Sequence, residues 1–353
     1  MADTFDIPQP RENDLLFGHE TVEAALHDAC KAGRLHHSLL FAGLRGIGKA
    51  TLAFRLARFL LKPAEEGLLG LDMPAADGFD VSTDDPVFRQ VAAGGHPALR
   101  VVERARNPDT GKVARDITVG DIRRLSEFFR MTTVTGGWRV AIVDPAEAMN
   151  QNAANALLKI LEEPPERSAI VLVSHAPGRL LPTIRSRCHV VQMSAPPRAA
   201  LATALGGFAL SAADEDLAML ADLASGSVGE AMALLQLDGL TMYRDICGLM
   251  DRRSGGFDRE LDAFGDKLSR NGQDEAFDLF VRLMQRAIGD RITAAARNGA
   301  SPQVGGELDR WLDVWEKVRV LLAQAGGLGL DRKHVILNAF LHVSSAAASA
   351  GTR

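Results

Sequence analysis

Residues 41–51 read Phe41-Ala42-Gly43-Leu44-Arg45-Gly46-Ile47-Gly48-Lys49-Ala50-Thr51, and they follow the apolar run Ser38-Leu39-Leu40. The spacing of Gly43, Gly48 and Lys49 is typical of a phosphate-binding loop, or P-loop. In such a loop the glycines let backbone amides face the phosphates, and the lysine neutralises the outer phosphate oxygens. The apolar run predicts a strand before the loop, and the pattern after Lys49 predicts a helix. The sequence therefore predicts an α/β protein whose phosphate-binding loop joins a strand to a helix.

The loop lacks one part of the P-loop pattern, the hydroxyl that holds a magnesium ion. A Ser or Thr normally follows the lysine, but position 50 is alanine. Thr51 does not replace it directly, because one residue along a helix turns a side chain by about 100°. We expect a degenerate nucleotide site, poor at hydrolysis and without a metal ligand set, formed by Gly43, Gly46, Gly48, Lys49, Thr51 and, from a later strand, Asp144. The sequence leaves open whether ATP or ADP binds there weakly, and no cofactor is required.

The bulk composition places the chain among soluble globular proteins. At 353 residues it is too long for one typical core, which predicts two or three domains. No apolar run approaches the ~18 residues of a membrane span, and the acidic start differs from a secretion signal, so we expect a cytoplasmic protein with no membrane contact. The cysteines Cys30, Cys188 and Cys247 are far apart and form no CxxC pair, which predicts reduced thiols and no zinc.

The net charge of −5 means that any contact with DNA has to come from a local basic patch. One candidate lies between Ala98 and Arg139, a segment that contains nine basic and five acidic residues. The basic residues are Arg100, Arg104, Arg106, Lys112, Arg115, Arg123, Arg124, Arg130 and Arg139. Two interpretations stay open at this point, a patch that binds DNA and an ordinary solvated face.

The chain up to about residue 190 alternates short apolar runs with helical patterns, as in a parallel sheet covered by helices on both faces. Residues 62–95 are rich in Gly, Pro, Ala and Asp and predict an irregular insertion. From Pro196 onward the pattern is helical. We predict a P-loop domain over 1–193, a small helical lid domain over 194–242 and an all-helical collar, or oligomerisation, domain over 243–353. The predicted strands are Ser38–Phe41, Leu99–Val102, Arg139–Val143, Ala169–Val173 and His189–Gln192.

An acidic residue follows the strand predicted at Arg139–Val143. The strand ends at Asp144, where a P-loop ATPase presents the acid that orients magnesium-bound water, although a strand-end residue can also simply cap the next helix. In an active ATPase of the AAA+ class a glutamate comes next and accepts the proton of the attacking water, but here Pro145 does. Glu147 is three residues on, and we expect it to project in another direction.

Two further segments carry a family resemblance. The first is Asn152-Ala153-Ala154-Asn155-Ala156-Leu157-Leu158-Lys159-Ile160-Leu161-Glu162-Glu163-Pro164-Pro165, a helix stopped by a proline pair. The second, Pro177-Gly178-Arg179-Leu180-Leu181-Pro182-Thr183-Ile184-Arg185-Ser186-Arg187-Cys188, ends in a Ser-Arg-Cys triplet. In this order, and with the P-loop before them, they closely resemble the clamp-loader branch of the AAA+ ATPases, and within it the delta-prime type of subunit of bacterial DNA polymerase III. The resemblance covers roughly residues 15–240, and the remaining tail fits by length and helicity.

The resemblance implies a role for Arg187 as an arginine finger that reaches the gamma-phosphate of ATP held by a neighbouring subunit. A planar guanidinium suits the charge that develops on phosphate oxygens during phosphoryl transfer. The alternative is that Arg187 pairs with a carboxylate of its own chain. This chain departs from the family in two places: residues 62–95 contain no cysteine for a zinc module, and Gly229 and Glu230 stand where active loaders place a sensor arginine.

The resulting hypothesis is a largely non-hydrolysing clamp-loader subunit that supports ATP-dependent loading of a sliding clamp onto primed DNA. The expected partners are gamma/tau and delta subunits, the clamp and primed DNA, all within a hetero-oligomer. The chain alone is then no autonomous ATPase, although it is part of a DNA-directed DNA polymerase complex. Two alternatives are an active gamma/tau-type ATPase, favoured by Lys49 and Asp144 and opposed by Ala50 and Pro145, and an unrelated P-loop motor acting on Holliday junctions.

Overall fold

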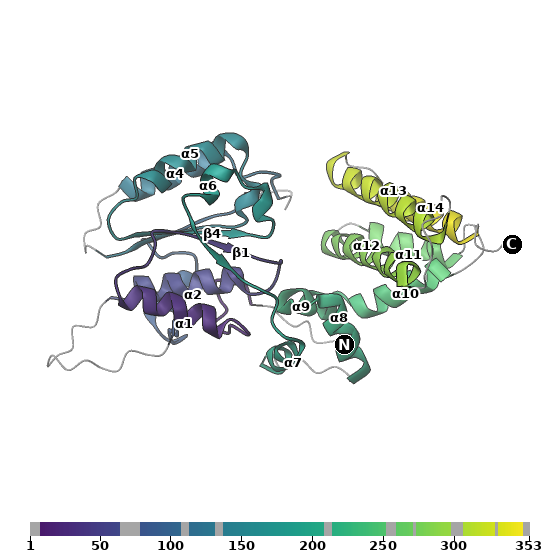
Figure 1. Ribbon diagram of the computed structural model, residues 1–353, viewed down its shortest axis with the longest axis horizontal. Coiled ribbons are helices and arrows are strands. Elements are labelled where there is room, and N and C mark those ends of the chain that lie inside the picture. Colours follow the sequence, from purple (N-terminus) through teal and green to yellow (C-terminus); the bar gives the residue numbers. More distant parts are fainter. Residues whose placement is uncertain are drawn as a thin grey trace. The chain divides into compact units, whose positions relative to one another are not determined.

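The computed structural model describes residues 8–63, 78–106, 113–130, 137–207, 214–251, 259–270, 273–297, 306–328 and 331–348. The chain divides into two compact units (Figure 1). The first comprises Met1–Ala212 together with Ala224–Glu230, and the second comprises Ala213–Leu223 together with Ala231–Arg353. The predicted boundaries at residues 193 and 242 remain a prediction.

The first unit is built on a parallel sheet of five strands in the order β2-β3-β4-β1-β5. The predicted strands are confirmed, each to within one residue at either end. β1 lies between β4 and β5, with Leu39 aligned to Val171 on one side and to His189 on the other. The carboxyl ends of all the strands therefore lie at one edge of the sheet, and their amino ends at the other. The strands are β1 Ser38–Ala42, β2 Leu99–Val102, β3 Arg139–Val143, β4 Ser168–Ser174 and β5 His189–Gln192.

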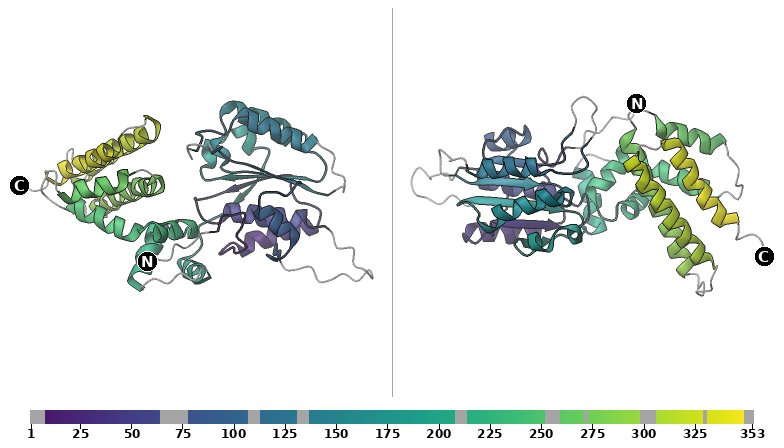
Figure 2. Two further views of the ribbon diagram at one scale, coloured as in Figure 1. Left: turned by 180° about the vertical axis from the view of Figure 1, so that it is seen from behind. Right: turned by 90° about the horizontal axis from the view of Figure 1, so that it is seen from above.

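Helices cover both faces of this sheet, as the sequence predicts (Figures 1 and 2). Successive side chains of a strand point to opposite faces. Leu39 and Phe41 accordingly pack with the helix after the P-loop, α2 (Lys49–Leu61). Leu40, between them, packs on the other face with α4 (Val119–Arg130) and α5 (Gln151–Glu162). The remaining helices of this unit are α1 Glu20–Lys31, α3 Pro86–Ala92, η1 Ala146–Ala148, η2 Pro177–Arg179, α6 Pro182–Arg185 and α7 Arg198–Gly207.

The prediction of an irregular segment over 62–95 was wrong for its second half. Residues 64–77 lie outside the described residues, but 86–92 form α3. The Asp85 side chain accepts a hydrogen bond of 2.8 Å from the Val87 N–H, and Pro86 occupies the first helical position. These are standard signals for the start of a helix. Burial of Val87, Phe88 and Val91 then holds the short helix in place.

The described residues of the second unit form helices joined by short turns and loops, which confirms the prediction for the tail. Its core contains a cluster of four phenylalanines, Phe264, Phe277, Phe280 and Phe340, with ring centroids 5.9 to 6.4 Å apart. Among the helices that the structure describes, none combines the length and apolarity needed to cross a membrane. The helices that form or enter this unit are α8 Asp214–Ala224, α9 Val228–Gln236, α10 Gly239–Asp251, α11 Arg259–Ser269, α12 Asp274–Arg297, α13 Glu307–Leu328 and α14 Arg332–Ala348.

Candidate functional site

The P-loop occupies the carboxyl edge of the sheet, between β1 and α2. Its bend relies on two glycines with positive φ, Gly46 at 75° and Gly48 at 102°. Gly48 is the residue that caps the start of α2, and a side chain there would be strained in this left-handed conformation. The predicted strand–loop–helix unit is therefore present.

Lys49 turns back onto its own loop. It is 2% exposed, and its Nζ donates a hydrogen bond of 2.8 Å to the Gly43 carbonyl oxygen and another to the Leu44 carbonyl oxygen. Burial lowers the pKa of Lys49 to about 8, although Asp144 and Glu147 act in the opposite direction. The Lys49 ammonium thus donates two of its hydrogen bonds to backbone carbonyl oxygens of the loop itself.

The two residues after Lys49 offer no replacement for the missing hydroxyl. Ala50 is half-buried and Thr51 is 7% exposed, one position further along α2. The two side chains point in directions that differ by about 100° around the helix. Thr51 therefore belongs to the buried side of α2.

A charged cluster lies beside the loop at the same edge of the sheet. Asp144 directly follows β3, and burial raises its pKa to about 6, assisted by the nearby Glu103 and Glu147 and opposed by Lys49 and Arg45. Glu147, which we expect to project in another direction than a residue directly after Asp144, reaches the end of β4. Its Oε1 accepts a 2.9 Å hydrogen bond from the backbone N–H of His175, directly after β4, because η1 turns the chain back toward the sheet.

A segment before α1 lies against the loop from another side. His19 is 3% exposed, its Nε2 lies 2.5 Å from the Ile47 carbonyl oxygen, and burial lowers its pKa. A Cβ added to Gly48 would come within 3.0 Å of Leu16. This part of the chain therefore packs directly on the glycine bend.

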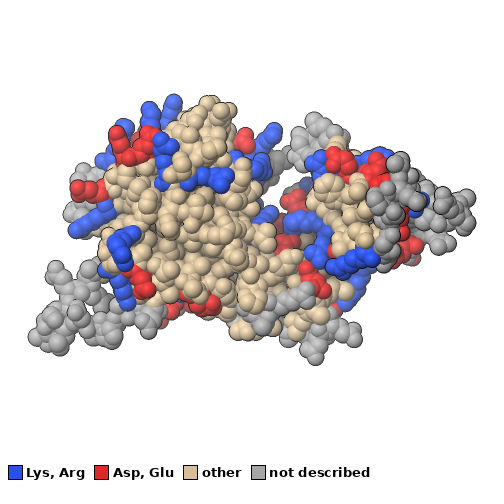
Figure 3. All heavy atoms as spheres, in the orientation of Figure 1, with Lys and Arg blue, Asp and Glu red and all other residues tan. Residues whose placement is uncertain are grey.

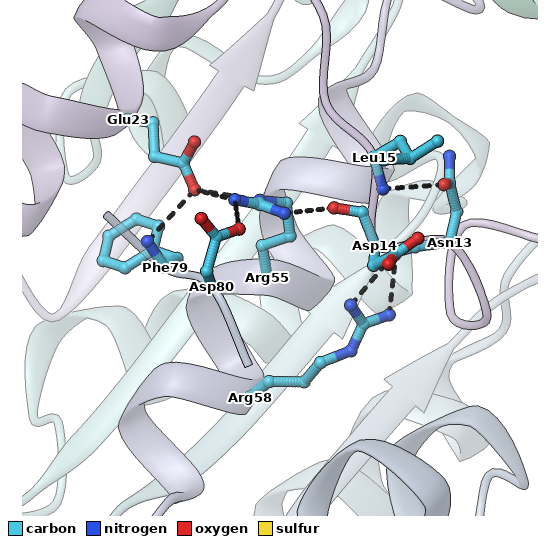
Figure 4. Close-up of polar contacts among 8 residues, drawn as sticks. All are labelled: Asn13, Asp14, Leu15, Glu23, Arg55, Arg58, Phe79 and Asp80. Atoms are coloured by element: carbon cyan, nitrogen blue, oxygen red, sulfur yellow. Dashed lines mark hydrogen bonds and ion pairs between the residues drawn. The ribbon is translucent and has the colours of Figure 1, made fainter. Parts of the chain in front are cut away.

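Two buried arginines of α2 hold that segment in place (Figure 4). Arg55 donates to the Glu23 carboxylate at 2.9 Å and to Asp80 at 2.5 Å, and also to the Asp14 carbonyl oxygen. Arg58, which is 1% exposed, donates to the Asn13 carbonyl oxygen at 3.0 Å and to that of Arg11 at 2.8 Å. The helix that begins with Lys49 thus anchors the chain that covers the loop.

The start of α9 lies on the outer turn of the P-loop. The Gly229 N–H donates a 2.9 Å hydrogen bond to the Gly46 carbonyl oxygen. Ser227 caps α9 by accepting a 3.1 Å hydrogen bond from the Glu230 N–H. A Cβ on Gly46 would lie 2.3 Å from the Ser227 hydroxyl oxygen, so only glycine fits. The segment predicted to lack the sensor arginine therefore contacts the loop through its backbone.

Arg187 lies at the other end of the strands from the P-loop, near their amino ends. It precedes β5, whose first residue, His189, is aligned with Leu39 near the amino end of β1. Its side chain is 37% exposed and forms a 2.7 Å ion pair with Glu162, the last residue of α5, while Nη1 donates to the Thr183 carbonyl oxygen at 3.0 Å. Arg187 therefore has a carboxylate partner within its own chain, Glu162, as the alternative interpretation expects. The neighbouring thiol of Cys188 is buried, which raises its pKa to about 12.

Sequence comparison relates the segment that forms this site to a known protein family. The family model described as DNA polymerase III, delta subunit matches residues 18–197, which contain the P-loop, Asp144 and Arg187. Relatives named DNA polymerase III subunit delta' are 38% identical over 205 residues in Pseudomonas aeruginosa and 33% identical over 217 residues in Escherichia coli. The chain belongs to the DNA polymerase III delta' subunit family. The first alignment covers 58% of this chain and 56% of the relative, and the second covers 62% and 60%, so the chain spans less than two thirds of either relative.

A relative that is named as a different subunit aligns over a larger share of this chain than the two delta' relatives do. The tau subunit of Escherichia coli DNA polymerase III is 27% identical over 322 residues, which is 89% of this chain and 44% of the relative. The family match itself confirms the resemblance drawn from the sequence motifs. The individual roles assigned to Gly43, Gly46, Gly48, Lys49, Thr51, Asp144 and Arg187 stay predictions.

The structure also brings two residues to the loop of this delta' family member that the sequence did not place there. Spacing along the chain predicts another direction for Glu147, and no motif assigns a role to His175. A usable signal existed for His175, because it comes two residues after the predicted strand Ala169–Val173, and in parallel sheets such positions gather at the carboxyl ends of the strands. No comparable signal existed for Glu147, since its direction depends on the turn at η1.

The basic segment from Ala98 to Arg139 is partly used within the fold. Arg139 donates to the Phe128 and Phe129 carbonyl oxygens at 2.8 and 2.9 Å, at the end of α4, and Arg124 pairs with Asp121 at 2.5 Å. Figure 3 shows Lys and Arg side chains, mixed with acidic ones, on the side of the first unit that carries α4 and α5. The exposed arginines of the segment include Arg100, Arg104, Arg106, Arg115, Arg123 and Arg130.

Proposed function

We propose that this chain is a delta'-type subunit of a DNA polymerase III clamp loader that supplies Arg187 to ATP held by a neighbouring subunit and does not itself hydrolyse ATP. The observation that carries the proposal is the separation of Arg187 from its own P-loop. From Leu39, level with the start of β5, to Gly43 the strand advances by about 3.3 Å per residue, or roughly 13 Å in total. That distance exceeds the reach of an arginine side chain, so Arg187 cannot serve its own loop.

The chemistry of Arg187 suits a site on another chain. Its guanidinium is more than one third exposed and keeps a permanent positive charge. A second chain packed against this edge would place its nucleotide phosphates within reach, and the planar fork would spread positive charge over the oxygens that gain charge during phosphoryl transfer. The partners in this proposal are gamma/tau and delta subunits, a sliding clamp and primed DNA.

The state of the P-loop supports the absence of hydrolysis. Lys49 is bound to two loop carbonyls, Ala50 provides no magnesium ligand, and Pro145 provides no general base. One oxygen of the nearby Glu147 carboxylate, Oε1, accepts a hydrogen bond from the His175 backbone N–H. A nucleotide would have to displace the Lys49 contacts first and would then still lack a positioned metal and base.

The experiment is a comparison of reconstituted complexes that contain wild-type chain, Arg187→Ala, Arg187→Lys or Arg185→Ala. Arg185→Ala is the matched control, because Arg185 is an exposed arginine two positions away. An arginine finger contributes about 10³ to 10⁵ in rate at its own site. DNA-stimulated ATP turnover should fall for Arg187→Ala, partially if several ATP sites exist, and Arg187→Lys should recover little because an ammonium lacks the planar fork. Equal turnover and equal clamp loading in all four complexes would refute the finger.

A second candidate is an active gamma/tau-type ATPase, which the long alignment with tau and the presence of both Lys49 and Asp144 favour. ATP turnover by the isolated chain separates the two. We expect only a trace rate, and no rescue by Ala50→Thr alone, because Pro145 still leaves the water without a base. Robust turnover that Lys49→Ala abolishes would establish the gamma/tau-type function instead.

A further inference from the structure

We propose that Glu162 is a positioning residue that restrains Arg187 against its own subunit until a neighbouring ATP competes for the guanidinium. The inference rests on the proposed role of Arg187 as a finger. Glu162 Oε1 lies 2.7 Å from Arg187 Nη2, and the two residues come from elements far apart in sequence, the end of α5 and the turn before β5.

Two contacts define the orientation of the guanidinium. Nη2 meets the Glu162 carboxylate, and Nη1 donates to the Thr183 carbonyl oxygen at 3.0 Å. Since the guanidinium is planar, two contacts on its two terminal nitrogens fix its plane. The side chain is therefore ordered along the surface of its own subunit, and a new anion has to compete with Glu162 for the charge.

The place of Glu162 in α5 makes it a suitable restraint. As the last residue of the helix, it lies at the negative end of the helix dipole, where a carboxylate is disfavoured. The next residues, Glu163, Pro164 and Pro165, add another negative charge and end the helix. Arg187 therefore compensates the negative charge of Glu162, which the dipole of α5 does not stabilise.

The strength of the pair fits a reversible restraint. The Arg187 and Glu162 side chains are 37% and 48% exposed, and exposed pairs of this kind shift an equilibrium by at most about fivefold. By contrast, the pair of Arg55 with Glu23 is only 7% and 12% exposed and belongs to a buried network. A phosphate group offers more charge and paired acceptor oxygens to an arginine. Bound ATP would therefore outcompete Glu162, and the restraint would act mainly at low ATP.

The test uses the reconstituted complex with Glu162→Gln, which keeps the shape of the side chain and removes its charge. The matched control is Glu163→Gln, an exposed neighbouring carboxylate. Glu162→Gln should raise kcat/KM for ATP about two- to fivefold, while kcat at saturating ATP and DNA changes by less than that. Glu163→Gln should leave both unchanged. A merely structural role for Glu162 predicts an unchanged or lower kcat/KM, and that result would overturn the inference.

A second pair of variants separates this inference from the proposed function. In an Arg187→Ala background, Glu162→Gln should have no further effect, because the restrained group is gone. If Arg187→Ala lowers turnover but Glu162→Gln does not raise kcat/KM, the finger stands and the restraint is refuted. If Arg187→Ala has no effect, the proposed function fails, and the restraint fails with it. Thermal unfolding of each isolated variant confirms that folding is intact.

Discussion

The contact between the P-loop and the start of α9 can be tested with Gly46→Ala. Gly46 has a φ of 75°, and forcing an alanine into this left-handed region costs about 1–2 kcal/mol. The added Cβ would lie 2.3 Å from the Ser227 hydroxyl oxygen and 3.1 Å from the Glu230 nitrogen. Part of that overlap involves backbone, so rotating the Ser227 side chain does not remove it and α9 has to shift.

The shift should break the 2.9 Å hydrogen bond from Gly229 N–H to the Gly46 carbonyl oxygen, a loss of about 0.5–1.5 kcal/mol. Together with the backbone term, we expect a loss of about 1.5–3.5 kcal/mol in the free energy of unfolding. Gly33→Ala is the matched control. Gly33 has a similar φ of 63°, but an added Cβ would have no heavy atom within 4 Å. It should lose the backbone term alone, about 1–2 kcal/mol.

The assay is urea unfolding of the isolated chain, read as the midpoint at constant m value, with hydrogen exchange of the Gly229 amide as the local probe. Gly46→Ala should be the less stable variant and should speed exchange at Gly229, whereas Gly33→Ala should leave that exchange unchanged. If the two variants lose equal stability and Gly229 exchanges as in the wild type, the loop does not contact α9 in solution.

Three further predictions concern other parts of the molecule. Arg58→Met should destabilise the chain by about 3 kcal/mol or more, since its loss leaves the partly buried carbonyl oxygens of Arg11 and Asn13 without their donor, whereas Arg89→Ala, at an exposed position of α3, should change stability by less than about 0.5 kcal/mol in the same unfolding assay. Burial raises the pKa of Asp144 to about 6, so the folded state binds a proton more tightly than the unfolded state, and stability falls as pH rises from about 4 to about 6. Asp144→Asn should abolish that fall and stabilise the chain at pH 7 by up to about 3 kcal/mol, and an unchanged pH profile of the unfolding midpoint would contradict the burial of this carboxyl. If residues 243–353 form the collar, Trp315→Glu, at a 38% exposed site on α13, should weaken assembly with partner subunits in a pull-down without altering the fold, whereas Lys317→Glu on the same helix should have a smaller effect.

Much of the first unit follows from local patterns. The strands could be located because each is a short apolar run, and β1, β3 and β4 are buried along nearly their whole length. The P-loop was recognisable because its glycines and lysine have a defined spacing. The short helix α3 was missed although Asp85 and Pro86 signal its start, because the composition of the surrounding segment outweighed that signal.

The site was predictable only where a residue's position follows from its strand. Asp144 had to lie at the carboxyl edge and Arg187 at the amino edge, because each adjoins a strand of a parallel sheet. Direction and partners were not predictable in this way. The Glu147 carboxylate is directed by a turn of η1, and the choice of Glu162 over Glu163 as partner of Arg187 depends on which side of α5 faces the start of β5.

The sequence by itself therefore determined the five strands of the sheet, the loop with alanine at position 50 and, by resemblance, the family. The strands and the loop depend on apolar periodicity and on spacing along the chain, whereas the family depends on motifs that resemble those of known proteins. The tertiary structure alone decided that Lys49 binds its own loop, that α9 covers Gly46 and that Glu162 pairs with Arg187. Each of these contacts joins groups through the directions of side chains and turns, and for the last two the partners are more than twenty residues apart, so no local pattern specifies them.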